Sequence, residues 1–453
     1  MEREYDVLVV GGCSAGLYFA AGMARQGYRV LLVEKDGGQE HGRRYDIFHL
    51  VWDSFSRFGV PQPEEGGEDF VLSFSRIVSR SALDRYPKNA TNEVYVLKRH
   101  GFLKRLKEWA QNLGVVVLHK ARFVSPVFNG AGQLSGGMIE YNDELHRVSA
   151  RLVADASGIP SVVRTALPDG YGVENFEIGP RDKFYVVLYY VKLDGPERDR
   201  VEGTCGWPYY KTWIAPQEDP DGAILGVGAN LSFEYAEYCF QKFAGRVSLP
   251  PHKVVRVEKG CTPYRRPPYS FVADGFIALG DAACLTNPWS GEGMAAAWVQ
   301  AEIAIDEAGR ALMDGAYPTQ ESLWRLNPRY YAAQGAQFAQ MLSMLAGAVS
   351  CTPEENDYEF SRSIIFRDEK EKEGSLMSGI IKGVLAGKLK FSTLRSLADA
   401  AHTGGRILKH YQAYPARPGD FPGWRMKADV LWKRARSMAD EAEKEAASVN
   451  IQK

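Results

Sequence analysis

The N-terminal part of the chain alternates short apolar runs with one amphipathic segment. Residues 6–10 are apolar and β-branched and end in two glycines, residues 14–26 carry apolar and small side chains at helical spacing, and residues 28–33 form a second apolar run. A strand, a helix and a strand in this order, within about 30 residues, make a βαβ unit, which requires a parallel sheet. The pattern therefore predicts an α/β fold.

Further elements follow along the chain. Residues 101–113 are amphipathic at helical spacing, residues 115–118 form a short apolar run, and residues 122–148 alternate apolar and polar positions between two glycine turns. This pattern predicts a helix, a strand and a small antiparallel meander. Residues 151–154 then form another buried strand.

The pattern changes in the middle of the chain. Long β-rich runs punctuated by proline and glycine predict a separate, mostly antiparallel sheet. Beyond it we expect one more buried strand, a helix, and a largely helical remainder that ends in a charged tail. The β-rich runs are 184–191, 209–214, 223–231 and 253–257; the later strand is 276–279, the helix about 291–312, and the tail 439–453.

Composition narrows the possibilities. A chain of 453 residues exceeds the usual size of one core, so we expect two or three domains. The net charge of -1 argues against a nucleic-acid binder, which would normally be basic. Six scattered cysteines without C-x-x-C spacing indicate reduced thiols, with neither a disulfide framework nor a metal site. With no secretory signal and no long apolar window, we expect a cytoplasmic protein.

A glycine-rich turn between the first strand and helix is the first chemical signal. It resembles G-x-G-x-x-G, in which glycines allow a tight turn and close packing while the helix N-terminus faces a pyrophosphate. Cysteine replaces the second glycine, and its backbone N–H can still donate. Glu34 ends the next strand, 18 residues after Gly16, where a carboxylate accepts bonds from adenosine ribose hydroxyls. The turn residues are Gly11, Gly12, Cys13, Ser14, Ala15 and Gly16.

Two further turns follow later strands. Asp155 and Gly158 come directly after the strand at 151–154, and Gly280-Asp281 follows the strand at 276–279. An aspartate in such a turn can accept bonds from ribityl or ribose hydroxyls, and the helix that starts nearby can place its positive end against a flavin pyrimidine ring. Three such turns in this order predict a dinucleotide site. The third continues through Pro288, Gly291, Glu292, Gly293 and Met294.

These segments resemble the FAD-dependent oxidoreductases of the p-hydroxybenzoate-hydroxylase type, and most of all the geranylgeranyl reductase group. That group's late motif, G-D-A-A followed by N-P-x-x-G-E-G, is matched here from Gly280 to Gly293. The resemblance covers roughly residues 1–315. It implies FAD as the cofactor and adds further contacts to the predicted cofactor site: Lys35, Arg99, and Arg43 or Arg44.

The resemblance also implies a division of the chain. We expect a discontinuous, Rossmann-like FAD-binding domain with a parallel sheet, an interleaved and mostly antiparallel substrate domain, and a helical C-terminal region. The FAD-binding domain comprises 1–75, 96–165 and 270–315, the substrate domain 76–95 and 166–269, and the helical region 316–453.

The substrate side matches the family only in part. Geranylgeranyl reductases carry Y-x-W-x-F-P over the flavin and related halogenases carry W-x-W-x-I-P, whereas residues 211–216 read Lys-Thr-Trp-Ile-Ala-Pro. The substrate therefore does not follow from the motif, and no catalytic side chain can be named. Aromatic residues here can face the isoalloxazine or simply pack in the core. The pocket candidates are Tyr209, Tyr210, Trp213, Pro216 and Trp289.

Several functions are compatible with these features. The first is a reductase that transfers a hydride from flavin N5 to a carbon–carbon double bond of an apolar, isoprenoid or lipid-like small molecule. The others are a flavin monooxygenase or halogenase, and an electron-transfer flavoprotein dehydrogenase. The sequence contains one dinucleotide fingerprint, so no second domain is predicted to hold NAD(P)H. We therefore expect the electrons to come from NAD(P)H that binds transiently or from a ferredoxin-like carrier. Apolar and basic residues at 375–397 indicate either a helix packed on its own domain or peripheral membrane contact.

Overall fold

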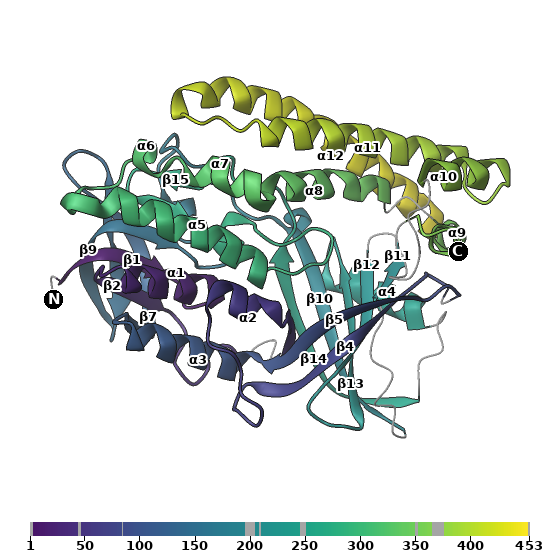
Figure 1. Ribbon diagram of the computed structural model, residues 1–453, viewed down its shortest axis with the longest axis horizontal. Coiled ribbons are helices and arrows are strands. Elements are labelled where there is room, and N and C mark those ends of the chain that lie inside the picture. Colours follow the sequence, from purple (N-terminus) through teal and green to yellow (C-terminus); the bar gives the residue numbers. More distant parts are fainter. Residues whose placement is uncertain are drawn as a thin grey trace.

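Two sheets lie side by side in the computed structural model, and long C-terminal helices cross one side of both (Figure 1). The N-terminus lies at the end formed by the first sheet, and the C-terminus at the other end of the molecule. The structure describes residues 3–43, 47–83, 85–194, 204–207, 210–244, 251–348, 352–364 and 376–451.

The first sheet contains the predicted βαβ unit. Its strand order is β15-β16-β9-β1-β2-β6, and β1 pairs in parallel with both β2 and β9. The predicted meander is an antiparallel extension, in which β8 joins β7 to β9. The bounds are β1 Arg3–Val10, β2 Val30–Glu34, β6 Val116–His119, β7 Ala121–Phe128, β8 Leu134–Tyr141, β9 Glu144–Asp155, β15 Val272–Ala273 and β16 Phe276–Ala278.

The core of this sheet explains why its central strands are apolar on both faces. Val7, Leu8 and Val9 are fully buried, as expected for a strand with parallel neighbours on either side. Trp298 and Phe102 contribute large buried rings from the helices that cover the sheet. Those helices are α1 Ser14–Arg25, α3 Arg99–Asn112 and α5 Met294–Leu312, with the short α2 Asp53–Phe58 beside them.

The second sheet is antiparallel except for one pair of strands, as the β-rich pattern predicts. Its order is β14-β10-β13-β12-β11-β4-β5-β3, and β11 runs parallel to β4. In the sequence, β3, β4 and β5 precede α3 and the other strands of this sheet follow it. The two sheets are therefore interleaved along the chain. The bounds are β3 Ile47–Val51, β4 Phe70–Arg80, β5 Lys88–Lys98, β10 Lys183–Leu193, β11 Thr204–Trp207, β12 Tyr210–Pro216, β13 Gly222–Ala229 and β14 His252–Pro263.

The short helix α2 and the longer helix α4 were not predicted. Residues Phe233–Ala244 form α4, which lies between β13 and β14. Its buried residues Ala236, Cys239 and Phe243 recur at intervals of three and four, and they pack against Val227 of β13. The helical spacing is visible in the sequence, but its aromatic residues also fit a β-rich region.

The C-terminal region is helical, as expected. The helices α8 and α11 pack along each other, and α12 contacts both. Trp324, Tyr331 and Tyr411 are buried where this region meets the first sheet's core. The bounds are α6 Gln320–Leu323, α7 Leu326–Tyr330, α8 Ala336–Ala348, α9 Pro353–Ser361, α10 Leu376–Leu385, α11 Phe391–Gln412 and α12 Phe421–Ile451; Tyr331–Gly335 is a π-helical turn, and short 3-10 turns cover Arg164–Ala166, Pro180–Asp182, Gly280–Ala283 (η3), Met313–Gly315 and Pro418–Asp420.

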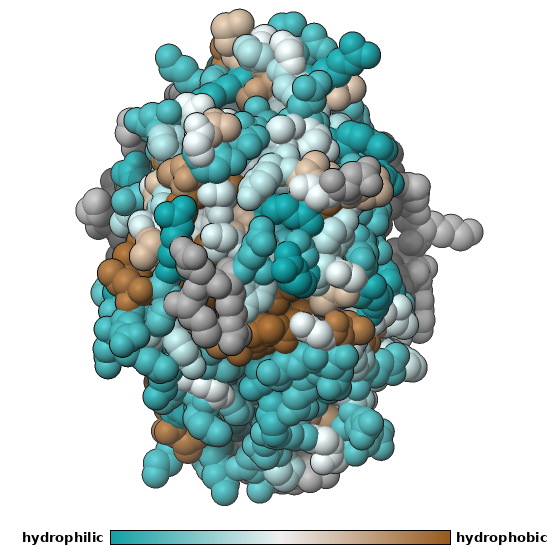
Figure 2. Space-filling view, turned by 90° about the vertical axis from the view of Figure 1, so that its left-hand side faces the viewer, coloured by the Kyte–Doolittle hydropathy of each residue, from teal (hydrophilic) through white to brown (hydrophobic). Residues whose placement is uncertain are grey.

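The surface is mostly hydrophilic on the face shown in Figure 2, and apolar groups there form small, separate patches. Within the described ranges no helix has both the length and the apolarity needed to cross a bilayer. The proposed domain boundaries remain a prediction.

Candidate flavin-binding site

The glycine turn after β1 packs directly against the turn after β9. Gly11 has a φ of +107°, and a Cβ at this position would lie 2.3 Å from the carbonyl oxygen of Ala156. A Cβ on Gly16 would lie 2.1 Å from the carbonyl oxygen of Gly11. Cys13 turns its thiol to Ala156, and its Sγ donates to that carbonyl oxygen over 3.2 Å. Only glycine fits at positions 11 and 16, as the sequence motif predicts.

Glu34 organises the same turn from the end of β2. Its Oε2 accepts a hydrogen bond from Gly12 N at 2.7 Å, and its Oε1 accepts from Asp36 N at 2.9 Å. His41 lies beside it, with Nε2 3.7 Å from Oε2, and burial lowers the pKa of this imidazole. The carboxylate keeps spare lone pairs for a ligand hydroxyl. His41 was not predicted, because it lies in a loop without a motif.

Asp155 holds the second turn together. One carboxylate oxygen accepts from the backbone N–H and the hydroxyl of Ser157 at 3.0 and 2.6 Å, and the other accepts from Val163 N and Arg164 N at 3.1 and 2.8 Å. The side chain is fully buried. Asp155 therefore shapes the loop in which Gly158 adopts a positive φ of +76°; a direct contact with the cofactor remains a prediction.

The third turn, η3, contacts both of the others. A Cβ on Gly280 would lie 3.0 Å from the Cβ of Ala15. The carbonyl oxygen of Ala282 accepts from Ser161 Oγ at 3.3 Å and from Arg164 Nε at 3.1 Å. Three turns that are more than 100 residues apart in the sequence thus meet at one edge of the sheet.

Asp281 is the acidic group of this meeting point. Burial raises the pKa of its carboxyl group to about 6, while Arg99 and a hydrogen bond with Thr286 act in the opposite direction. The Thr286 hydroxyl also lies 2.5 Å from the hydroxyl of Thr262 at the end of β14. Asp281 and Arg99 were both predicted site residues, and their electrostatic interaction brings the start of α3 to the η3 turn.

The loop before α5 is fixed by its own polar groups. Asn287 Oδ1 accepts from Trp289 N at 2.9 Å and from Ser290 N at 3.2 Å. Glu292 Oε1 accepts from Ala295 N at 2.6 Å, and burial raises the pKa of this carboxyl group. The helix therefore starts at Met294, slightly later than expected, with Glu292 bonded to its first turn.

These residues fit FAD. The helix α1 has no side-chain cap and no acidic residue in its first turn, so its own side chains leave its first N–H groups and its positive end open toward the Gly11–Gly16 loop. The loop carries no side chain at its three glycines, and the side chain of Cys13 is turned toward the turn after β9. Glu34 could supply an acceptor for the adenosine ribose, and Asp281 could supply one for a polyol chain.

The pocket candidates have different surroundings. Trp213 covers Gly226 of the next strand, where a Cβ would lie 2.0 Å from the ring, and it packs in a hydrophobic cluster. Pro216 pairs in register with Ala223, and the side chain of Trp289 is 41% exposed. Tyr209 and the side chain of Tyr210 lie outside the described residues. A role for these residues over the isoalloxazine remains a prediction.

Two of the remaining predicted contacts, Lys35 and Arg43, lie on the surface beyond β2. Lys35 is exposed, and Arg43 donates through Nε to the carbonyl oxygen of Gln39. Arg44 lies outside the described residues. Of the described residues, no group of three or more His, Cys, Asp or Glu side chains is placed to hold a metal ion.

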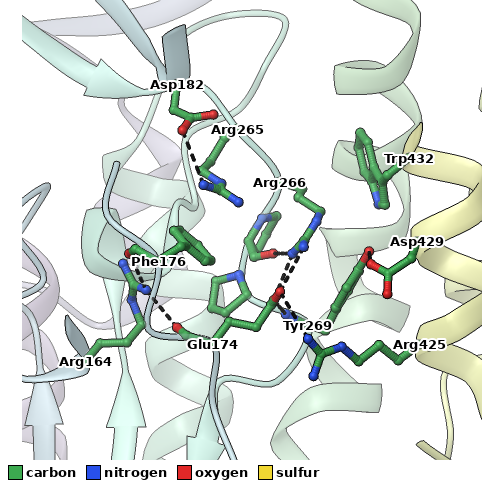
Figure 3. A network of polar contacts seen from close by, with 12 residues as sticks. Arg164, Glu174, Phe176, Asp182, Arg265, Arg266, Tyr269, Arg425, Asp429 and Trp432 are labelled. Carbon is green, nitrogen blue, oxygen red and sulfur yellow. Dashed lines mark hydrogen bonds and ion pairs between the residues drawn. The ribbon is translucent and has the colours of Figure 1, made fainter. Parts of the chain in front are cut away.

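A buried polar network ties the η3 turn to the C-terminal helices (Figure 3). Besides Ala282, Arg164 donates to the carbonyl oxygens of Glu174 and Phe176, each at 2.8 Å. The Glu174 carboxylate accepts two bonds of 2.9 Å from Arg266. Tyr269 N donates to Glu174 at 2.8 Å, and its hydroxyl donates to Asp429 of α12 at 2.7 Å. The network also contains an aromatic ring, that of Phe176, which contacts two arginines. The guanidinium carbons of Arg164 and Arg265 lie 4.2 and 3.5 Å from its centroid.

Comparison with known proteins agrees with FAD as the cofactor. Residues 6–168 match the FAD dependent oxidoreductase family. The digeranylgeranylglycerophospholipid reductase of Sulfolobus acidocaldarius is 24% identical over 446 residues, which cover 94% of this chain and 97% of the relative. The enzyme of the same name from Picrophilus torridus is 28% identical over 333 residues, which cover 69% and 79% of the two chains.

Solved structures share the fold. A geranylgeranyl bacteriochlorophyll reductase-like protein from Thermoplasma acidophilum superposes with a TM-score of 0.71 at 18% identity, over 88% of this chain and all of that chain. The myxobacterial chondrochloren halogenase CndH gives a TM-score of 0.61 at 18% identity, over 89% and 97% of the two chains. The chain is thus an FAD-dependent oxidoreductase that resembles the geranylgeranyl reductase-like proteins.

Proposed function

We propose that the protein reduces carbon–carbon double bonds in an isoprenoid or similar apolar lipid. The observation that carries this proposal is the similarity to a digeranylgeranylglycerophospholipid reductase along nearly the whole length of both chains. It extends through the second sheet and the C-terminal helices, so it is not limited to the cofactor-binding segments. The mismatches at Lys211 and Ala215 leave the individual lipid open.

In this proposal the chain positions the cofactor and excludes water. Bound FAD supplies the hydride chemistry. The Gly11–Gly16 loop and the α1 N-terminus hold the pyrophosphate, Glu34 holds the adenosine ribose, and Asp281 orients the ribityl chain. The loop before α5 places its fixed backbone and the helix's positive end at the pyrimidine side.

Electrons come from outside the chain. The Gly11–Gly16 turn is the single G-x-G-x-x-G-like fingerprint in the sequence, and it is assigned to FAD. The donor is therefore either a nicotinamide nucleotide that binds transiently or a ferredoxin-like carrier. Anaerobic reduction by NADH, NADPH and a reduced ferredoxin, followed by flavin absorbance, distinguishes these donors.

The proposed activity can be tested without knowing the natural donor. The FAD-loaded protein is reduced anaerobically with dithionite and mixed with a geranylgeranyl-bearing lipid, and the products are analysed by mass spectrometry. We expect the lipid to gain two hydrogen atoms for each double bond reduced while flavin absorbance at the oxidised band returns. An unchanged lipid with no flavin reoxidation, across lipids with phosphate, glycerophosphate and free alcohol ends, would contradict the proposal.

A halogenase or monooxygenase is the second candidate, because CndH and a flavin-dependent brominase share the fold with TM-scores of 0.61 and 0.60. Halogenation and hydroxylation by a reduced flavin both require oxygen. The reduced protein is mixed with oxygenated buffer, a halide and phenolic or pyrrolic test compounds. Halogenated or hydroxylated products would favour it over the reductase, which should turn over lipid with oxygen excluded.

We also propose that the protein is cytoplasmic and contacts a membrane through the junction of α10 and α11. Ile381, Leu385 and Phe391 are 49, 82 and 72% exposed, whereas Ile380 and Leu389 of the same segment are buried. Exposed apolar side chains next to lysines are typical of interfacial helices. Cosedimentation with anionic vesicles tests this contact. Leu385→Glu with Phe391→Glu should abolish binding, and Met426→Glu on exposed α12 is the control.

A further inference from the structure

A lysine on β12 has surroundings that are unusual for a charged group. Lys211 stands where the reductase motif has tyrosine, and both of its cross-strand neighbours, Gly206 and Gly228, are glycines. Phe184 fills the space over Gly228, where a Cβ would lie 2.2 Å from its ring. Lys211 Nζ lies 5.5 Å from the ring centroids of Phe184 and of Tyr264, and these two rings stack at 4.7 Å.

The ammonium group has three neutral acceptors. Nζ donates to the Tyr264 hydroxyl at 3.0 Å, to the carbonyl oxygen of Pro288 at 3.1 Å, and to the carbonyl oxygen of Trp289. A lysine ammonium has three N–H donors, so its capacity is used in full. Two of these acceptors belong to the loop that leads into α5. Lys211 thus links the second sheet to the predicted flavin loop.

The charge on Lys211 has no counter-ion within the part of the chain that the structure describes. Of the acidic groups on nearby elements, Asp281 interacts with Arg99 and Thr286, and Glu292 bonds the first turn of α5. Cys261 of β14 interacts with Asp281 and Lys183. Burial alone lowers the pKa of Lys211 to about 7. A desolvated cation without a counter-ion is costly unless the site gains a negative charge at some stage of its cycle.

We propose that Lys211 is the counter-charge for the reduced state of the bound cofactor, and that it takes up a proton when electrons enter the site. The geometry supports this role because the ammonium group holds the Pro288–Trp289 peptide, within the loop proposed to face the flavin pyrimidine. Reduction adds negative charge at that side of a flavin, which favours the charged form of a nearby amine. Lys211 is therefore a positioning and charge-balancing residue.

Protons and electrons balance in this step. With dithionite as the reductant, two electrons and one proton enter the cofactor, which gains one negative charge. A second proton passes from solvent to the neutral amine of Lys211, which becomes an ammonium group. Above neutral pH, reduction therefore takes up two protons, and without a titrating Lys211 it takes up one.

The test is the pH dependence of the flavin midpoint potential, which requires bound FAD but no substrate. Each proton taken up with two electrons changes the equilibrium constant for reduction tenfold per pH unit, about 30 mV. Between pH 7.5 and 9 we expect a slope of about 60 mV per pH unit in the wild type and about 30 mV in Lys211→Met. The Lys211→Met variant should also be harder to reduce.

Two variants separate charge from structure. Lys211→Arg keeps a permanent charge, so its potential should exceed that of Lys211→Met while its slope falls to about 30 mV. Lys192→Met removes an exposed lysine from β10 of the same sheet and should match the wild type. FAD content and melting temperature confirm that each variant folds. If Lys211→Met does not retain FAD, the slope measured for Lys211→Arg alone decides whether the proposal holds. A slope that stays near 60 mV in either Lys211 variant, or a wild-type slope near 30 mV, overturns the proposal. Because lipid is absent, the outcome is independent of the proposed reductase activity.

Discussion

Replacing Arg164 with methionine should destabilise the protein and weaken FAD binding together. The guanidinium group is fully buried and donates to three backbone carbonyl oxygens, those of Glu174, Phe176 and Ala282. The carbonyl oxygens of Glu174 and Phe176 lose this donor, which costs about 1–3 kcal/mol each, whereas the carbonyl oxygen of Ala282 keeps the Ser161 hydroxyl. Removing a buried charge recovers several kcal/mol of desolvation. The net loss is therefore about 2 kcal/mol, because the recovered desolvation offsets part of the lost hydrogen bonds and of the contact with the Phe176 ring.

Urea unfolding of the apoprotein measures this loss, and FAD titration by flavin fluorescence measures the second effect. We expect a lower urea midpoint at similar slope, and at least tenfold weaker FAD binding because Ala282 lies in the η3 turn. Arg425→Met is the matched control: this half-exposed arginine lies 3.9 Å from Glu174 and should contribute less than about 1 kcal/mol. If Arg164→Met unfolds within about 0.5 kcal/mol of the wild type, the network does not stabilise the fold as argued.

Three further outcomes follow from the site. Glu34→Ala should weaken FAD binding at least tenfold in a fluorescence titration, because the N–H of Gly12 loses its acceptor; equal affinity would contradict the assigned role. The pKa of Asp281 is raised to about 6, so the folded apoprotein binds the extra proton between about pH 4 and 6, and its stability falls as pH rises through that window. Urea midpoints at pH 4.5 and 7 should differ less in Asp281→Asn. Gly226→Ala places a Cβ 2.0 Å from Trp213 and should cost about 1–3 kcal/mol in urea unfolding, whereas Ala at exposed Gly405 should not.

The sequence predicts the first sheet well because its evidence is local. Apolar runs, glycine turns and strand-end carboxylates identify β1, α1, β2 and the later turns, and the three turns do meet. The pattern does not show which strands pair when they are far apart in the sequence. The assignment of β3, β4 and β5 to the second sheet depends on contacts with β11 and with one another. No local signal specifies such contacts.

Site residues without a motif were missed for a related reason. His41 beside Glu34, Thr286 beside Asp281 and Tyr264 beside Lys211 acquire their roles only through the chain's fold. Trp213 is a different case: its motif predicts a pocket wall, the structure shows its ring against Gly226, and its role over the flavin stays a prediction. Patterns identify residue types, and packing decides what each side chain can reach.

The place of β16 next to β9 in the first sheet has a consequence for synthesis of the protein. β9 ends at Asp155, yet its parallel partner β16 begins at Phe276, and α5 follows later still. During translation one edge of β9 stays unpaired until more than 100 further residues have been synthesised. An unpaired edge strand can pair with a wrong strand. The dinucleotide cradle therefore cannot close before α5, which starts at Met294, has been synthesised.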